Sequence, residues 1–344
     1  MSYTPKAEDQ QSFEQDQFIG YALEVDASDT DSALGDLDRE SITTSLTPSV
    51  TQYRYSHGRR YNAFEEGTYW LPNDEAEIER LDVQHHVWRL TLNGKLYISP
   101  ISDHVQNVLD IGTGTGRWVI EFADEHPSAQ VLGTDLSPIQ PSWTPSNCSF
   151  LIDNAENEWL FDNKFDFIHS RMLLMGIHDW PRYFKQTWDN LRPGGWMEVH
   201  EVQFPVCSAD ESLEQETSFV VWSQYVRDAS AKVGIDTMAG SKFKRQLEDK
   251  GFINIRKEPV KWAIGPWPKG SKEKDIGKLT LENTREFMSA ISMALFTKNL
   301  GWTTEEIEAF LAKARADLED RKKHYYWQMY ILCAQKPTTA VDDP

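Results

Sequence analysis

The sequence predicts an α/β fold with a mostly parallel, seven-stranded sheet whose last strands form an antiparallel edge. Apolar segments of strand length alternate with helical segments from about residue 106 to residue 201, which is typical of a parallel sheet covered by helices on both faces. A glycine-rich turn separates the first strand from the first helix, in the segment "NVLDIGTGTGRWVIEFADEHPSAQVLGTDLSP" (107–138). Hydrophobic residues make up 40% of the 344-residue chain, which is sufficient for a large core.

Residues 51–104 precede the sheet and are predicted to hold an aromatic segment followed by a helix. Residues 53–72 show no helical or strand period, so we expect them to be irregular. Asn73 is the expected N-cap, because acidic residues follow it and would face the positive end of a helix. Gly94 is expected to end the helix. Between them, the residues at helical spacing are Ile78, Leu81, His85, Trp88 and Leu92.

Residues 105–262 are predicted to form the core of the fold. The expected strands are 106–111, 130–135, 148–152, 165–169 and 194–201, then 253–260 and the C-terminal "YYWQMYILCAQ" (325–335). The expected helices are 116–125, 181–191, 212–233, 241–250, 280–298 and 304–319. We predict that the last two strands form the antiparallel edge, with residues 321–338 completing the sheet, and that the helices of residues 263–320 form a cap on the substrate side.

Residues 1–50 are predicted to form a disordered acidic tail. They carry eleven acidic residues against Lys6 and Arg39, about half of the excess behind the net charge of −19, and they are rich in Ser and Asp. Such a tail either keeps the chain solvated or docks a regulatory protein partner. The acidity of the whole chain argues against nucleic acid as a direct substrate, because duplex binding relies on basic side chains that face phosphates.

The three cysteines, Cys148, Cys207 and Cys333, are far apart and form no C-x-x-C pair, so no metal site and no disulfide framework is expected. No apolar run approaches the ~18 residues of a membrane span, and the N-terminus lacks an apolar signal core. The sequence therefore predicts a soluble protein of the cytoplasm, the nucleus or both, without a membrane partner.

The spacing of the glycines identifies the kind of cofactor. A dinucleotide fingerprint G-x-G-x-x-G that starts at Gly112 would need glycine at position 117, which is arginine. The glycines instead stand at 112, 114 and 116, two residues after Asp110, in the pattern D-x-G-x-G-x-G. This pattern resembles the first motif of class I methyltransferases, which use S-adenosylmethionine. Glycine at such a turn lets the backbone approach a ligand where a Cβ would collide.

Polar residues at the ends of the next strands complete the predicted cofactor site. Asp135 ends the second strand, nineteen residues after Gly116, where a carboxylate can accept hydrogen bonds from both ribose hydroxyls. The segment "DNAEN" (153–157) follows the third strand, where this fold class contacts adenine. His169 and Arg171 follow at the fourth strand, near the methionine part of the cofactor. Each of these residues could be structural, but their order at successive strand ends favours a site.

Nearly the whole chain after residue 50 resembles the LaeA-like fungal methyltransferases, which are tied to secondary metabolism and development. The resemblance rests on "GRRYNAFEEGTYWLPNDEAEIERLDVQHH", "VLDIGTGTG", "GTDLSPIQP", "FDFIHSR", "DWPRYFKQTWDNLRPGGWMEV", "GPWPK" and "LGWT". It implies a Rossmann-like class I methyltransferase fold with S-adenosylmethionine as the cofactor. The cofactor contacts that it implies are Gly112, Thr113, Gly114, Asp135, Leu136, Asp153, Asn154, Ala155 and His169, with Tyr61 closing over the cofactor. Asn154 departs from a pattern that is often acidic, although its side-chain oxygen can still accept a hydrogen bond.

Three residues are candidates for a catalytic base. His178 lies after the fourth strand, which borders the methyl-donor site in this fold class, and His200 and Glu201 are expected at the C-terminal end of the fifth strand. Because side chains of a strand alternate between its faces, His200 and Glu201 cannot both point inward unless the strand ends between them. For each of the three, a satisfied polar residue without a catalytic role is the alternative.

Two functions remain open from the sequence. The first is an enzyme that methylates a small molecule, most readily at oxygen, in fungal secondary metabolism. The second is a LaeA-like regulator that binds S-adenosylmethionine and acts through a protein complex. The [DN]-P-P-[YF] motif of amino-methylating nucleic-acid enzymes does not follow the fourth strand, where the sequence reads "HSRM".

Overall fold

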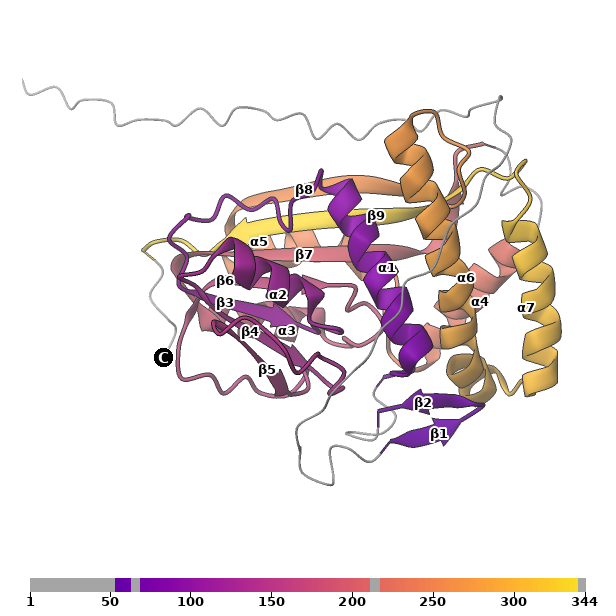
Figure 1. Ribbon diagram of the computed structural model, residues 1–344, viewed down its shortest axis with the longest axis horizontal. Helices are drawn as coiled ribbons and strands as arrows, with labels where there is room; N and C mark the ends of the chain where they lie inside the picture. The colour runs from indigo at the N-terminus through magenta and orange to yellow at the C-terminus, as the bar shows by residue number, and fades with distance from the viewer. Residues whose placement is uncertain (1–52, 63–68, 211–216, 340–344) are drawn as a thin grey trace, which may run out of the picture.

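The computed structural model describes residues 53–62, 69–210 and 217–339, which form a seven-stranded sheet and a separate hairpin. Its strands are β3 (Asn107–Ile111), β4 (Gln130–Asp135), β5 (Cys148–Ile152), β6 (Phe165–Arg171), β7 (Leu191–Ser208), β8 (Ile253–Ala263) and β9 (Tyr325–Gln335). The order across the sheet is β5-β4-β3-β6-β7-β9-β8, and the strands from β5 to β7 are parallel (Figure 1). Strand β9 is antiparallel to β7 and to β8, so the predicted antiparallel edge and the class I methyltransferase topology are confirmed.

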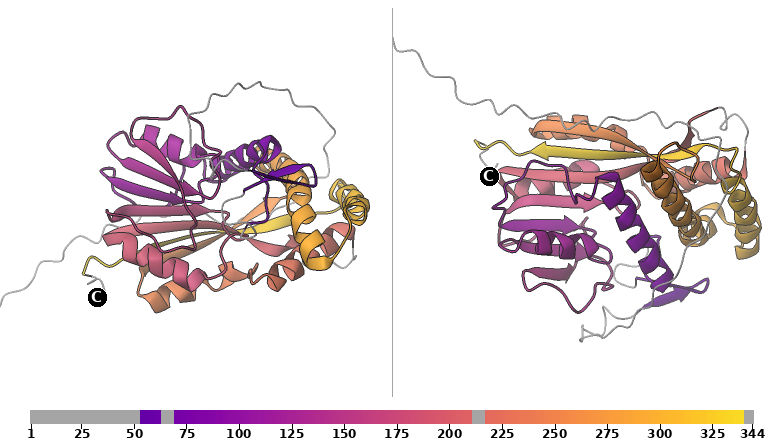
Figure 2. Two further views of the ribbon diagram at one scale, coloured as in Figure 1. Left: turned by 90° about the horizontal axis from the view of Figure 1, so that it is seen from below. Right: turned by 45° about the horizontal axis from the view of Figure 1, so that its top comes forward.

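Helices cover both faces of the sheet, as the alternating pattern predicts. Helices α1 (Glu75–Thr91) and α2 (Arg117–Glu125) lie on one face, and α3 (Trp180–Asn190) and α5 (Phe243–Lys250) lie on the other (Figure 2). Helices α4 (Ser218–Lys232), α6 (Ser271–Leu300) and α7 (Thr304–Leu318) gather beyond the end toward which the parallel strands run (Figure 1). Since α6 and α7 lie between β8 and β9 in the chain, they form the predicted helical insertion of residues 263–320, which we call the cap, and α4 packs against both helices.

The N-terminal segment differs from the prediction. Strands β1 (Arg54–Ser56) and β2 (Arg59–Tyr61) form an antiparallel hairpin where an irregular segment is expected. The N-cap of α1 is Asp74 and not Asn73, because the Asp74 carboxylate accepts from the Glu77 amide. Asp74 also pairs with Arg59, with 2.6 Å between Nε and Oδ2, so one side chain both starts the helix and holds the hairpin against it. Asn73 instead donates to the Ser137 hydroxyl, after β4.

Other expected boundaries also need correction. Strand β7 runs on to Ser208 instead of ending at residue 201, because its second half pairs with the first half of β9, a partner more than 100 residues away in the sequence. Helix α6 begins at Ser271 instead of residue 280. The expected start of the 212–233 helix falls partly on 211–216, which lie outside the described residues, and α4 is described from Ser218.

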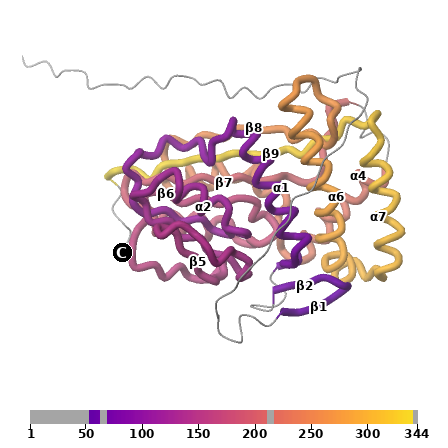
Figure 3. Tube along the Cα trace, in the orientation of Figure 1, coloured from indigo at the N-terminus to yellow at the C-terminus, as the bar shows by residue number. Residues whose placement is uncertain are grey.

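Segments distant in the sequence meet at the capped end of the sheet. The path of the chain brings α1 beside α6, with the β1–β2 hairpin near one end of both helices (Figure 3). The predicted acidic tail, residues 1–50, lies outside the part of the chain that the structure describes. Within the described ranges, no helix combines the length and apolarity needed to cross a bilayer.

Candidate cofactor site at the glycine-rich turn

The turn between β3 and α2 brings the backbone close to its surroundings. Gly112 has φ +67° and Gly114 has φ +57°, a left-handed backbone conformation that side chains with a Cβ disfavour. A Cβ at Gly112 would also collide with the side chain of Leu173, from the loop after β6. Gly116 is the N-cap of α2, with its own positive φ. Glycine is therefore strongly favoured at position 112, because any larger residue would be strained and would have to displace Leu173.

Asp135 joins this turn to the end of β4. Its Oδ2 accepts from the Gly114 amide at 2.8 Å, and its Oδ1 accepts from the Ser137 amide at 2.8 Å. Burial raises the pKa of Asp135 to about 6, so the carboxylate is ionised at neutral pH. Each carboxylate oxygen keeps a second lone pair, which can accept a hydrogen bond from a ligand. Leu136 follows directly, and its backbone amide also supports the carboxylate.

A small polar cavity of about 40 Å³ lies beside the turn, under α1. Its lining residues are Leu81, Gln84, Asp110, Gly112, Thr113, Gly114, Thr115, Trp118, His169 and Arg171. Five of these are predicted site residues that the fold brings together, and Arg171 is the predicted neighbour of His169. Leu81 and Gln84 come from α1. The sequence signal for them is helical periodicity, which indicates a buried face but not a contact with the glycine-rich turn.

His169 and Asp110 form a buried pair at the bottom of this cavity. His169 Nδ1 lies 2.7 Å from Asp110 Oδ1, and the imidazole stacks on Trp118 with ring centroids 4.0 Å apart. Burial raises the pKa of Asp110 to about 7 and, together with nearby positive groups, holds the pKa of His169 well below its usual value. A neutral His169 that donates from Nδ1 to Asp110 presents Nε2 as an acceptor. Among the described residues, this fully buried Nε2 has no hydrogen-bond partner.

The predicted adenine segment lies next to Asp135. The Asp153 amide donates to the backbone carbonyl of Asp135 at 3.0 Å. The Asn154 side-chain oxygen accepts from the Glu156 amide at 2.9 Å, so it also shapes this turn. The Ala155 carbonyl accepts from Trp159 Nε1. The turn is fixed by these bonds beside the Asp135 carboxylate, but it does not line the 40 Å³ cavity.

His178 lies beside the same turn, and Tyr61 lies in the β1–β2 hairpin. His178 Nδ1 lies 2.7 Å from Glu156 Oε2, and its amide donates to the other carboxylate oxygen. The imidazole is 34% exposed, so its ring remains accessible to a substrate. Sequence reasoning missed Glu156 as its partner. Tyr61 is buried in the β1–β2 hairpin, and it does not line the cavity.

His200 and Glu201 are not at a strand end, which corrects their expected position. Both lie in the middle of β7 and are fully buried, and their contacts lie on opposite faces, as strand alternation requires. His200 Nε2 lies 2.6 Å from Glu198 Oε1. Glu201 accepts from the amides of Leu173 at 2.6 Å and Leu174 at 3.3 Å, and burial raises its pKa to about 8. Glu201 thus holds the loop whose Leu173 side chain faces Gly112.

The topology and the glycine-rich turn agree with a comparison to known families. Residues 83–257 match the family described as Methyltransferase domain. The chain belongs to this methyltransferase family. Its curated relatives include the methyltransferase pytC of Aspergillus terreus, which is 38% identical over 302 residues, covering 88% of this chain and 93% of pytC. The secondary metabolism regulator laeA of Aspergillus fumigatus is 31% identical over 302 residues, covering 86% and 80%.

These matches confirm the predicted resemblance to LaeA-like proteins. They also confirm the predicted activity, which is methyl transfer from S-adenosylmethionine. Among solved structures, phosphoethanolamine N-methyltransferase 2 of Haemonchus contortus in complex with S-adenosyl-L-methionine matches with a TM-score of 0.40 and 18% identity. The match covers 75% of this chain and 52% of that protein.

Proposed function

We propose that this methyltransferase binds S-adenosylmethionine across the glycine-rich turn and transfers its methyl group to a small-molecule acceptor. The observation that carries the proposal is the contact between the turn and Asp135, whose carboxylate accepts from the Gly114 amide at 2.8 Å and is the proposed ligand of the ribose. The same turn borders a polar cavity that holds a buried acceptor, His169 Nε2, and a guanidinium, Arg171. The acceptors Asp135 and His169 Nε2 suit the hydroxyl and ammonium groups of the cofactor, and the donor Arg171 suits its carboxylate.

Each part of the cofactor has residues that fit it. Asp135 would hold the ribose hydroxyls, and the 153–155 turn would contact adenine. Arg171 and Gln84 would bind the carboxylate of the methionine part, since a guanidinium forms a paired hydrogen-bonded contact with a carboxylate. Asp110 and His169 Nε2 would accept from its ammonium group.

The bound cofactor supplies a methyl group on a positively charged sulfur, which is already activated for transfer. The residues of the chain then mainly have to hold the methyl group and the acceptor in line, and such alignment can lower a barrier by roughly 7–11 kcal/mol. An acceptor hydroxyl additionally needs a base, and positioned general bases contribute about 10²–10⁴ in rate. His178 is the proposed base, because its ring is partly exposed while Glu156 fixes its orientation.

The acceptor is proposed to be a small molecule of fungal secondary metabolism. The support is the relationship to pytC and to the Emericella nidulans protein named probable methyltransferase tdiE, which is 34% identical over 306 residues. The alignment spans 93% of pytC and 80% of the laeA protein, so the length of the chain is closer to that of the former. O-methylation is the proposed reaction.

The regulatory alternative is supported by the laeA relatives and by the acidic composition of residues 1–50. A comparison of metabolite masses in cells with and without the gene separates the two functions. Loss of one CH₂ unit from a single product supports the enzyme, whereas silencing of many unrelated products supports the regulator.

Asp135→Asn is expected to weaken the binding of S-adenosylhomocysteine, the demethylated cofactor, by about thirtyfold to a thousandfold in isothermal titration calorimetry. The amide loses the charge, and its NH₂ group would face an amide donor, Gly114 or Ser137, where the carboxylate accepts from both. A hydrogen bond to a charged group is worth about 1–2 kcal/mol more than one to a neutral group, so weakening two bonds from the ribose costs about 2–4 kcal/mol. Unchanged affinity in the variant, or no binding by the unmodified protein, contradicts the proposed site.

His178→Ala is expected to lower the turnover number by about 10²–10⁴ while S-adenosylhomocysteine affinity stays the same, because the base acts on the acceptor and not on the cofactor. Single-turnover methyl transfer from radiolabelled S-adenosylmethionine measures this once an acceptor is in hand. Arg182→Ala, on the exposed side of the same loop and helix, is the matched control. Equal turnover in the two variants would remove His178 from the mechanism.

A further inference from the structure

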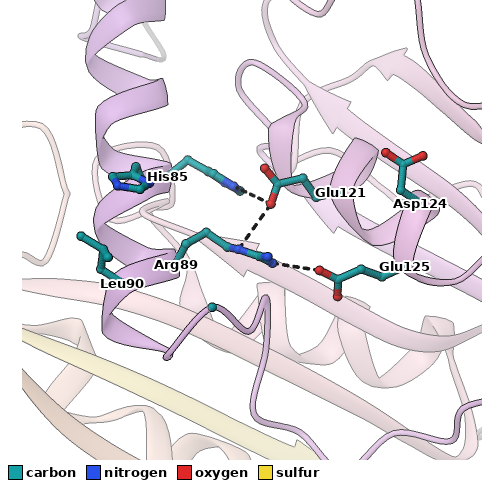
Figure 4. A pocket seen from close by; sticks show the side chains of 8 residues that line it. His85, Arg89, Leu90, Glu121, Asp124 and Glu125 are labelled. Carbon is teal, nitrogen blue, oxygen red and sulfur yellow. Dashed lines mark hydrogen bonds and ion pairs between the residues drawn. The ribbon is translucent and has the colours of Figure 1, made fainter. Parts of the chain in front are cut away.

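His85 of α1 connects the cofactor cavity to the surface of the molecule. His85 Nδ1 lies 3.0 Å from Arg171 Nη2, and Arg171 lines the cavity beside the glycine-rich turn. On its other side, His85 Nε2 lies 3.1 Å from Glu121 Oε2 of α2. Glu121 and Arg89 line an open groove of about 440 Å³ between α1 and α2, where dashed lines mark the ion pairs (Figure 4). His85 itself is 5% exposed.

The contacts of His85 determine its protonation. A guanidinium is always protonated and can only donate, so His85 Nδ1 must accept from Arg171. The single proton of the neutral ring is then on Nε2, where it faces the Glu121 carboxylate. Among the described residues, this is the one hydrogen bond that the Arg171 side chain makes. Its remaining N–H groups are therefore available to a ligand.

We infer that His85, in its neutral form, is a positioning residue that holds the Arg171 guanidinium in the cavity wall, where it takes the carboxylate of the cofactor's methionine part. The inference rests on the proposed function. Arginine has a long side chain with many rotamers, and a fixed acceptor on one Nη atom aligns the planar fork that a carboxylate needs. Glu121 Oε2, 3.1 Å from Nε2, favours the tautomer that carries its proton on this nitrogen.

The charged groups around His85 favour this neutral form. Burial lowers the pKa of His85, and the positive charges of Arg171 on β6 and Arg89 on α1 lower it further, against the opposing effect of Glu121. Asp110 on β3 and His169 on β6 also lie within electrostatic reach. Protonation would remove the lone pair that accepts from Arg171 and would place two positive charges side by side.

Two substitutions separate the contact of His85 with Arg171 from its contact with Glu121. His85→Asn keeps an acceptor oxygen at the position of Nδ1 and loses the contact with Glu121. His85→Gln keeps a donor at the position of Nε2 and loses the acceptor for Arg171. We expect the dissociation constant of S-adenosylhomocysteine to rise by about tenfold to a hundredfold in His85→Gln and to stay within about threefold in His85→Asn.

A shortened ligand distinguishes positioning from a general structural role. 5′-Methylthioadenosine keeps the adenosine and sulfur but lacks the amino-acid carboxylate. Its affinity should therefore be the same in the unmodified protein, in His85→Asn and in His85→Gln. His86→Asn is the matched control, because His86 neighbours His85, is exposed and lines only the surface groove. Calorimetry with both ligands, with melting curves to verify folding, gives the comparison.

The outcomes are distinct. If the unmodified protein binds neither ligand, the proposed function fails. If it binds S-adenosylhomocysteine and the Gln and Asn variants bind it equally well, or if both ligands weaken in parallel, the inference about His85 is wrong.

The pH dependence gives a second test that needs only the His85→Asn variant. The pKa of His85 is lowered from the ordinary histidine value of 6.5, so His85 gains its proton only as the pH falls below 6.5. S-adenosylhomocysteine binding should weaken over that acidic range. Asp110 and Asp135, with pKa values of about 7 and about 6, also gain protons over this range. The His85 contribution is therefore the difference between the two proteins, and the variant should lose less affinity at acidic pH. Identical pH profiles would overturn the inference.

Discussion

Gly112→Ala is expected to weaken S-adenosylhomocysteine binding by about a hundredfold. The added methyl group would collide with Leu173 and displace it, which would disturb the turn at the proposed cofactor site. The residue would also keep φ near +67°, which costs about 1–2 kcal/mol for a residue with a Cβ. Calorimetry with the purified variant measures the affinity, and urea unfolding measures the stability.

Gly94→Ala is the matched control for this experiment. Gly94 has φ +83°, so alanine there suffers a comparable backbone strain, but nothing lies within 4 Å of the added Cβ. Both variants should lose the stability that the positive φ costs, Gly112→Ala should lose more because Leu173 must move, and only Gly112→Ala should lose affinity. Equal affinities would show that the turn does not approach the cofactor.

Arg80→Met is expected to lower the free energy of unfolding by about 3–5 kcal/mol, because it leaves a buried carboxylate without its partner. Arg80 and Glu77 are both 3% exposed, and Arg80 Nη2 lies 2.7 Å from Glu77 Oε1. Arg80 also donates from Nη1 to Asn283 Oδ1 at 2.8 Å, which ties α1 to α6 of the cap. Urea denaturation at neutral pH measures the change.

Two controls show whether the loss comes from the unpaired charge. The double variant Glu77→Leu, Arg80→Met removes both charges and should recover most of the stability, since apolar pairs often replace buried ion pairs at little cost. Lys185→Met breaks an exposed pair with Asp189 and should cost less than about 1 kcal/mol. If Arg80→Met costs no more than Lys185→Met, the buried Arg80–Glu77 pair contributes no more to stability than an exposed ion pair.

The parts of the fold that could be predicted are those coded by short stretches of sequence. Strands β3 to β6 alternate with helices or turns at spacings that leave little choice of topology, and the glycines at 112, 114 and 116 exclude the dinucleotide spacing. The confirmed fold class, a mostly parallel sheet with an antiparallel edge, follows from these local patterns, together with the two apolar segments that become β8 and β9.

The errors arise where a distant partner decides the structure. The β1–β2 hairpin is held by the Arg59–Asp74 ion pair, and Asp74 rather than its equally suitable neighbour Asn73 becomes the N-cap. Strand β7 continues past Glu201 because β9 pairs with it, so His200 and Glu201 are buried inside a strand and not at its end. His200 still lies opposite Arg171, the last residue of β6. Neither the pairing of Asp74 with Arg59 nor the pairing of β7 with β9 can be predicted from the residues adjacent in the sequence.

The sequence by itself determined the class of fold, the position of the glycine-rich turn and the carboxylate that follows it, because these depend on backbone conformation and on short spacings. Only the tertiary structure decided which polar residues of α1 face that turn. Gln84 and His85 occupy a helical face that the period marks simply as buried. A buried polar side chain requires a partner, and for His85 that partner is Arg171 on β6, 86 residues further along the chain.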